Sequence, residues 1–494
     1  MNRKLPVFKN LLYLSGGKVF EILCLFFYIA IVARYLGVEE FGEYSFLWAI
    51  LILLSVIPDA GINSVLIRDL TLKSNENSRY FGGAIVSRYL LCVVIFFCFL
   101  LTVHILGLFP ASRGSLYFGL MWMFFRMATL SNNAVFLAYE RLDLESYFTA
   151  LGSSLILIFT FFVTRFTDYR ITGIFASQAL AEAITSVSSF IVLSAVLLKP
   201  KIEFAPSLWM HYFKNSFSVA GSRMARNVYN RIDIFFLYKF RGVGEVGIYS
   251  APYNLIQRMS FFGLLLSRPV YPALCWFANH DKKMLSQISQ KWIKILTLIG
   301  IPISVGCITF SNSIISLLLG KGFEESSTVL SLLGIIFFFS FPNALLWFLS
   351  LSLGLQHVLL RYTVLSLIIN TIIDLLFIPK YGYWGACAGT LAAELFFMIS
   401  CMIKIKKSNP VFEFRFIDVF GKPLFAGVLM AIVAILLQKY CHISVTIFLV
   451  ITTYVLVVLM TKTFTRSDIK SIREILRYRT EFQNKQINEA GELL

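Results

Sequence analysis

Long apolar stretches recur along almost the whole chain, and short polar connections separate them. Because about 20 apolar residues suffice for a helix to cross a bilayer, we expect an all-α polytopic membrane protein with about 14 transmembrane helices. The expected spans are 11–32, 46–67, 81–108, 116–138, 148–163, 171–197, 217–237, 246–277, 292–319, 329–353, 358–378, 384–403, 420–437 and 445–460.

The distribution of lysine and arginine between the connections predicts an orientation. An even number of spans places both termini on one side, and the basic residues are concentrated in the segments on that side. Cytoplasmic loops carry such an excess. We therefore expect both termini of this multi-pass membrane protein to be cytoplasmic.

An internal repeat organises the helices. When the chain is displaced by 205 residues, 11 of the 43 positions from 8 to 50 are identical, and the matches cluster where 34–45 falls on 239–250. Six helices separate the copies, which predicts two pseudo-symmetric six-helix lobes in parallel orientation. The expected organisation is an N-lobe (1–200), a C-lobe (201–410), two further helices (411–462) and a cytoplasmic amphipathic tail (463–494).

The most similar part of the repeat predicts a tight turn between two helices. Its glycines permit unusual backbone angles, and its glutamate can interact favourably with the start of the following helix. The corresponding pairs are Gly37 with Gly242, Gly42 with Gly247, and Glu40 with Glu245. We interpret this segment as structural rather than as a substrate contact.

Composition agrees with a membrane protein. The chain is 58% hydrophobic and only 14% charged, whereas a soluble domain carries about 25% charged residues. The net charge of +17 follows from the cationic loops, so the expected partner is the lipid bilayer and not nucleic acid. The eight cysteines show no metal-binding spacing, so neither a metal nor another cofactor is expected.

Span 217–237 is the most polar of the expected helices. Arg223, Arg226, Arg231 and Asp233 fall within an arc of about 160° on a continuous helix. Arginine binds two anion oxygens at once and stays charged. We therefore expect this face to line an aqueous cavity and contact an anionic head group, facing the corresponding helix of the first lobe, although a purely structural role stays open.

Other charges inside the spans have alternative interpretations, because a charge at this depth needs a partner, a cavity or access to the interface. Lys18 lies near a helix end and could reach the interface by snorkelling. Asp59 lies between Pro58 and Gly61, so it could cap a broken helix or bind an ion. Asp374 and Glu394 could pair with cations or have a functional role.

The chain resembles the Wzx-type oligosaccharide flippases of the polysaccharide transporter family, in the superfamily that also contains multidrug exporters and peptidoglycan-precursor flippases. The segments that carry the resemblance are 15–17, 33–45 and 59–61, together with the repeat of the turn and the number of helices.

The resemblance implies alternating access between two lobes, driven by a proton or sodium gradient. The implied substrate is an undecaprenyl-diphosphate-linked oligosaccharide for O-antigen, capsule or exopolysaccharide, with a polysaccharide polymerase and a chain-length regulator as further partners. The substrate-binding residues it suggests are Arg223, Arg226, Arg231, Arg126 and Arg258, and the ion-coupling residues are Asp233 and Asp59.

Three other functions stay open at this stage. A peptidoglycan-precursor flippase would share the cationic cavity and the number of helices. A drug or cation antiporter of the same superfamily should have a less cationic cavity. A membrane-embedded polymerase or glycosyltransferase usually needs a larger outer loop than any in this chain.

Overall fold

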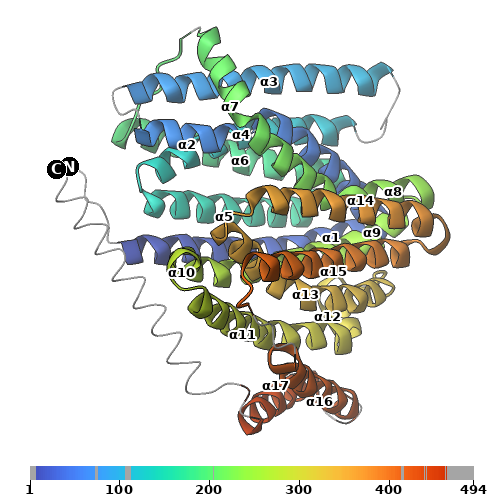
Figure 1. The fold of residues 1–494 in the computed structure, drawn as a ribbon. Coiled ribbons are helices and arrows are strands. Elements are labelled where there is room, and N and C mark those ends of the chain that lie inside the picture. Colours follow the sequence, from blue (N-terminus) through green and yellow to red (C-terminus); the bar gives the residue numbers. More distant parts are fainter. Residues whose placement is uncertain are drawn as a thin grey trace. The chain divides into compact units, whose positions relative to one another are not determined.

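The computed structural model is built from helices joined by short connections (Figure 1). It describes residues 7–59, 61–72, 76–105, 113–203, 205–412, 417–438, 440, 442–461 and 463. Every regular element in these residues is helical, which confirms the predicted all-α class. The amphipathic tail expected over 463–494 lies outside the described residues, apart from its first position.

The helices of the first half are α1 (Val7–Asp59), α2 (Ile62–Leu72), α3 (Asn77–Ile105), α4 (Arg113–Ala138), α5 (Leu142–Phe166), α6 (Arg170–Val196), α7 (Pro206–Tyr229), α8 (Ile232–Arg241) and α9 (Val243–Ser267). Those of the second half are η2 (Arg268–Val270), α10 (Tyr271–His280), α11 (Lys282–Thr309), α12 (Ser311–Leu318), α13 (Ser326–Ser352), α14 (Gln356–Tyr381), α15 (Tyr383–Ser408), η3 (Ile417–Gly421), α16 (Lys422–Leu437) and α17 (Ile443–Met460).

Ten of the helical segments in the described residues are long and apolar enough to cross a membrane. The first of them, Ser15–Leu72, contains two of the expected spans, since α1 continues through a kink. The polar helices α4 and α7 are not among the ten, and Ser444–Met460 is apolar but shorter. The chain is therefore a multi-pass membrane protein, and the expected number of 14 spans stays a prediction.

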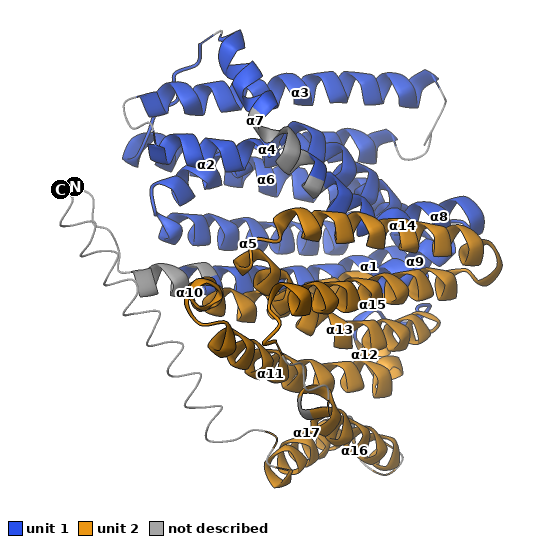
Figure 2. Cartoon of the chain, in the orientation of Figure 1, with its two compact units in different colours: residues 1–251, 318–323 blue, residues 252–317, 324–494 orange. Residues whose placement is uncertain are grey.

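The chain forms two compact units (Figure 2). The first contains the described residues up to Ala251 together with Leu318–Phe323, and the second contains Pro252–Leu317 and the described residues from Glu324 onward. The boundary falls inside α9, at Pro252, where a proline interrupts the helical hydrogen bonding.

In the first unit, α4 packs on α6 and α1 packs on α5, and a core under α2, α3 and α7 includes Leu66, Phe81 and Phe136. Helix α7 belongs to this unit through two polar contacts near its start. Tyr212 donates to the Tyr80 carbonyl oxygen at 2.8 Å, and His211 Nε2 lies 2.7 Å from Asp69 Oδ2.

In the second unit, α14 packs on α15 and α11 packs on α13, while α16 and α17 pack on each other beside α11. The Tyr454 hydroxyl donates to the Leu298 carbonyl oxygen at 2.9 Å, which ties α17 to α11. Glu394, a predicted intramembrane acid, accepts a 2.6 Å hydrogen bond from Asn343. Asp374 is fully buried in α14.

The repeated turn has the same backbone conformation in both copies. Gly37 has φ 75° and ψ 179°, and Gly242 has φ 88° and ψ −178°. Residues other than glycine rarely adopt these angles. The predicted break after Pro58 is confirmed, since α1 ends at Asp59, Gly61 has φ 76° and α2 begins at Ile62.

The prediction of one continuous helix over 217–237 is wrong. Helix α7 ends at Tyr229, Asn230 and Arg231 form a turn, and α8 begins at Ile232. Arg231 has φ −136°, outside the helical range, and Asp233 lies in the first turn of α8, where a carboxylate stabilises a helix start. The basic and acidic residues of this segment therefore lie on two helices and not along one face.

Candidate functional site

The first unit contains a polar cavity with a volume of about 280 Å³. Its wall is formed by α1, α2, α4, α5 and α6, and it carries five charged side chains, which are Lys18, Glu21, Arg126, Glu145 and Glu182. Charged groups inside an apolar helical protein usually mark a ligand or ion pathway. We therefore take this cavity as the candidate site.

The cationic groups of the cavity lie beside acids. Lys18 Nζ is 2.5 Å from Glu21 Oε2 one turn along α1, and Arg126 Nη1 on α4 is 3.4 Å from Glu182 Oε1 on α6. The Glu182 side chain is only 5% exposed, whereas that of Arg126 is 40% exposed and can reach a bound molecule. Three acids against two bases make the lining slightly acidic, which differs from the expected cationic cavity.

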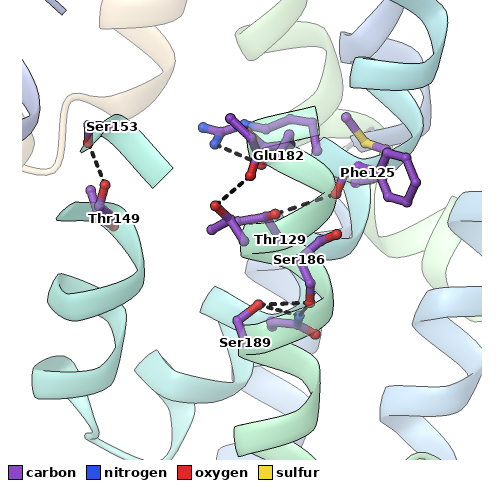
Figure 3. A network of polar contacts seen from close by, with 12 residues as sticks. Phe125, Thr129, Thr149, Ser153, Glu182, Ser186 and Ser189 are labelled. Atoms are coloured by element: carbon purple, nitrogen blue, oxygen red, sulfur yellow. Dashed lines mark hydrogen bonds and ion pairs between the residues drawn. The ribbon is translucent and has the colours of Figure 1, made fainter. Parts of the chain in front are cut away.

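Close packing of α4 on α6 positions the Arg126–Glu182 pair, and Figure 3 shows Glu182 among the polar side chains of this region. One to two turns further along both helices, the Asn132 amide donates to the Ser186 carbonyl oxygen at 3.1 Å and to Ser189 Oγ at 2.8 Å. These bonds cross the helix interface and fix its register, so the arginine of α4 and the glutamate of α6 meet at the cavity.

Neutral polar groups make up much of the remaining wall, namely Asn63, Ser64, Thr129, Asn133, Thr149, Ser153 and Thr185. Several hydroxyls are satisfied within their own helices, as when Ser153 donates to the Thr149 carbonyl oxygen (Figure 3). Asn133 differs, because its amide oxygen is enclosed and has no hydrogen-bond partner among the described residues.

Beside the cavity lies Arg88, whose side chain is fully buried. It donates to Asp59 Oδ1 at 3.1 Å, to Asn63 Oδ1 at 2.8 Å and to the Ser131 hydroxyl. Asp59, a predicted ion-coupling residue, is thus held in an ion pair at the end of α1. The buried arginine orients Asn63, which contributes to the cavity wall.

Arg226, Arg231 and Asp233 are not among the described residues that line this cavity. Arg231 is buried, with 8% of its surface exposed, and Arg226 is exposed near the end of α7. Asp233 is buried and accepts a 2.6 Å hydrogen bond from Tyr249. The side chain of Arg223 lies outside the described part of the structure.

The remaining predicted residues separate between the two units. Arg126 lines the cavity of the first unit, whereas Arg258 is half-buried in the part of α9 that belongs to the second unit. Of the predicted substrate-binding and ion-coupling residues whose side chains the structure describes, only Arg126 lies in the cavity wall.

From the sequence alone, Lys18 is interpreted as a charge near a helix end, and no role is given to Glu21 or Glu182. Their meeting depends on contacts between helices that are far apart in the sequence. Asn133 was missed altogether, although the pair Asn132-Asn133 in the middle of α4 is a detectable signal, since two adjacent amides are costly in an apolar helix.

The two copies of the repeated turn touch each other. A Cβ atom on Gly42 would lie 1.9 Å from the Val243 carbonyl oxygen, and one on Gly247 would lie 2.0 Å from that of Val38. The contact is reciprocal, with each glycine against the carbonyl four residues before the other. Such glycine contacts allow helix backbones to approach closely in membranes.

Two family models match the chain. The model described as "Polysaccharide biosynthesis protein" matches residues 7–276. The model described as "Lipid II flippase MurJ" matches residues 253–456.

Two curated proteins are related in sequence. A Haloferax volcanii protein named "Probable low-salt glycan biosynthesis flippase Agl15" is 23% identical over 40% of this chain and 41% of its own length. A Shigella flexneri protein named "Putative O-antigen transporter" is 22% identical over 77% of this chain and 93% of its own length. The chain thus matches about two fifths of the first relative and most of the second.

Solved structures share the fold. The lipid II flippase MurJ in an inward closed conformation has a TM-score of 0.76 at 17% identity, covering 92% of this chain and 99% of that one. A transporter of the MOP superfamily from Pyrococcus furiosus has a TM-score of 0.59 at 14% identity, with coverage of 81% and 96%. An inward-facing multidrug transporter of the MATE family has a TM-score of 0.60 at 13% identity, with coverage of 80% and 99%.

Proposed function

We propose that this chain, which belongs to the family of polysaccharide biosynthesis proteins, is a flippase that moves a lipid-linked oligosaccharide across the membrane. The family is one of membrane transporters and not of enzymes, and the resemblance to it expected from the sequence is confirmed. The observation that carries the proposal is the family match over more than half of the chain, in a fold shared with lipid flippases.

The proposed substrate is an undecaprenyl-diphosphate-linked repeat unit of O-antigen, capsule or exopolysaccharide, moved from the cytoplasmic to the outer leaflet. The names of the two curated relatives, a glycan flippase and an O-antigen transporter, support this class. The fourteen-helix arrangement of two six-helix lobes and two further helices, with both termini cytoplasmic, belongs to the same proposal. So does the bacterial cytoplasmic membrane as its location.

Within this function, we assign the diphosphate to the basic residues around the α7–α8 break. Arg226 precedes this break in α7, Arg231 lies within it, and Arg223 lies one turn before Arg226. A helix that ends inside a membrane protein exposes backbone groups that commonly contribute to substrate sites. Arg126 and Arg258 are proposed as further contacts of the substrate.

Asp233 and Asp59 are proposed as ion-coupling residues, with a proton or sodium ion as the driving ion. Their surroundings differ, because Asp233 accepts from a tyrosine whereas Asp59 is paired with a buried arginine. A carboxylate already neutralised by arginine is a weaker cation ligand. The ion pair with Arg88 therefore weakens the proposal for Asp59.

Deletion of the gene tests the function. Lipid-linked repeat units should be complete but stranded on the cytoplasmic leaflet, and surface glycan should be lost. Loss of glycosyl transfer, with incomplete repeat units, would contradict a flippase.

The double variant Arg223→Ala with Arg226→Ala tests the diphosphate site. The double variant should reach the membrane in normal amount but produce no surface glycan. The control is Lys214→Ala, which removes an exposed cation of the same helix and should remain active. Normal surface glycan in the double variant would remove α7 as the anion site.

A lipid II flippase is the second candidate, favoured by the model that matches residues 253–456. Depletion of the protein separates the two functions. Accumulation of lipid II with arrested cell-wall synthesis would establish this alternative, whereas normal growth with loss of surface glycan would support the polysaccharide substrate.

A further inference from the structure

We propose that the cavity of the first unit is a sugar-binding subsite that holds one pyranose ring of the translocated glycan. The inference rests on the proposed flippase function and assigns a chemical class of ligand to a site separate from the basic residues of α7 and α8. Size, charge and hydrogen-bonding groups of the cavity each support it.

The volume suits a single ring. At about 280 Å³ the cavity lies just below the usual range of small-molecule pockets, roughly 300–1,000 Å³. This is too small for a whole repeat unit and far larger than a dehydrated ion needs. A monosaccharide with some water fills such a space.

The charges of the wall disfavour a diphosphate. Glu21, Glu145 and Glu182 outnumber Lys18 and Arg126, and both cations lie beside an acid. A diphosphate would need a surplus of positive charge and would be repelled by the third acid. A lone cation would be attracted by the third acid, so the wall charges exclude an anion but not a cation. Competition with sodium tests that occupant. An uncharged ligand avoids the repulsion.

The polar groups match sugar hydroxyls. A hydroxyl both donates and accepts, so it can bind a carboxylate oxygen and an arginine N–H at the same time. Glu182 and Arg126 present such a combination, with the arginine 40% exposed. Asn133 and Thr149 add neutral polar side chains to the same wall.

The neutral side chains of Asn133 and Thr149 allow a test that leaves the ion pairs intact. The variants Asn133→Leu and Thr149→Val remove a polar group from the wall with little change in volume. The matched controls are Asn279→Leu, at an exposed position of α10, and Thr453→Val, at a half-buried position of α17, both outside the cavity.

The probe is the mixture of methyl glycosides obtained by methanolysis of the producing cell's own surface glycan. Binding to the full chain in lipid nanodiscs is measured by saturation-transfer difference NMR. We expect at least one glycoside to bind, and each cavity variant to weaken it about 2- to 12-fold, as for loss of one neutral hydrogen bond. The controls should bind as the wild type does.

Competition experiments decide between occupants. Inorganic diphosphate should not displace the glycoside. Sodium chloride should not displace it either, when choline chloride at the same concentration serves as the salt control. Displacement by diphosphate would make the cavity an anion site, and displacement by sodium would make it the cation site. Either result, or equal binding by the cavity variants and the wild type, would overturn the sugar subsite.

The gene deletion separates this inference from the proposed function. If deletion leaves the surface glycan unchanged, the flippase function itself fails. If deletion removes the glycan but no glycoside binds, only the sugar subsite fails.

Discussion

The two copies of the repeated turn, residues 34–45 and 239–250, are alike in backbone and different in their surroundings. Gly37 and Gly242 adopt the same left-handed conformation. Yet the helix before Gly37 runs unbroken, whereas the helix before Gly242 is interrupted at Asn230 and Arg231. The comparison teaches that both copies have the same turn backbone, although only the second copy follows a helix that is interrupted by polar residues.

Corresponding side chains also keep their contacts but change their chemistry. Tyr44 and Tyr28 are joined by a 2.9 Å hydrogen bond between their hydroxyls, and the corresponding pair is Tyr249 and Asp233, at 2.6 Å. One copy therefore has a neutral bond where the other has a tyrosine bound to a carboxyl group. The second copy places a carboxyl group where the first has the phenol of Tyr28.

The largest effect is expected at the ion pair between Arg88 and Asp59. Asp59 ends the part of α1 that follows the first copy of the turn. Arg88→Met would leave Asp59 partly buried without its cation, at a cost of about 3–5 kcal/mol. We expect little folded protein, measured as the yield of monodisperse transporter in detergent. A wild-type yield and melting temperature for Arg88→Met would show that the Arg88–Asp59 ion pair is dispensable. The control is Arg79→Met, at a half-exposed position of α3.

The contact between the two turns is the next test. Gly42→Ala and Gly247→Ala each push a methyl group into a backbone carbonyl, which should destabilise the protein by about 1–3 kcal/mol or more. The melting temperature should fall for both, because the contact is reciprocal. Gly244→Ala, where nothing lies within 4 Å of the added methyl group, should melt as the wild type does. Unequal effects of Gly42→Ala and Gly247→Ala would disprove the symmetry.

The tyrosine pairs sharpen the chemical difference. Tyr249→Phe should cost about 1.5–3 kcal/mol if its partner is charged, and Tyr44→Phe about 0.5–1.5 kcal/mol. Thermal unfolding of the two variants under the same conditions compares them directly. A larger loss for Tyr44→Phe would contradict the assignment of the stronger bond to the second copy.

The smallest effects are expected at the glutamates of the turns. Glu40 binds Arg170 of α6 through both oxygens, at 2.8 and 2.9 Å, whereas Glu245 binds Arg241 one turn away at 2.8 Å. Exposed pairs contribute about 0.2–1 kcal/mol. Glu40→Gln and Glu245→Gln should therefore barely change the melting temperature. The decrease should be larger for Glu40→Gln, because the Glu40–Arg170 pair joins two helices. A fall as large as that of Gly42→Ala would refute this order.

Several features could be predicted because they depend on local sequence. Apolar stretches of membrane-spanning length determine the all-α class, since backbone groups in lipid must be satisfied within a helix. The glycines at 37 and 242 and the Pro58–Gly61 break follow from the backbone freedom of glycine and the missing amide of proline. The repeat was visible because both copies keep these residues.

What only the tertiary structure decided is which distant side chains meet. Helix propensity is a weak guide in polar segments, so the break at Asn230 was not foreseen. Arg126 finds Glu182 56 residues later, and Arg88 finds Asp59 on another helix, because helix packing and not sequence distance brings them together. The sequence by itself determined a membrane transporter with charges inside it, and the packing of α1, α2, α4, α5 and α6 determined that five of those charges share one cavity.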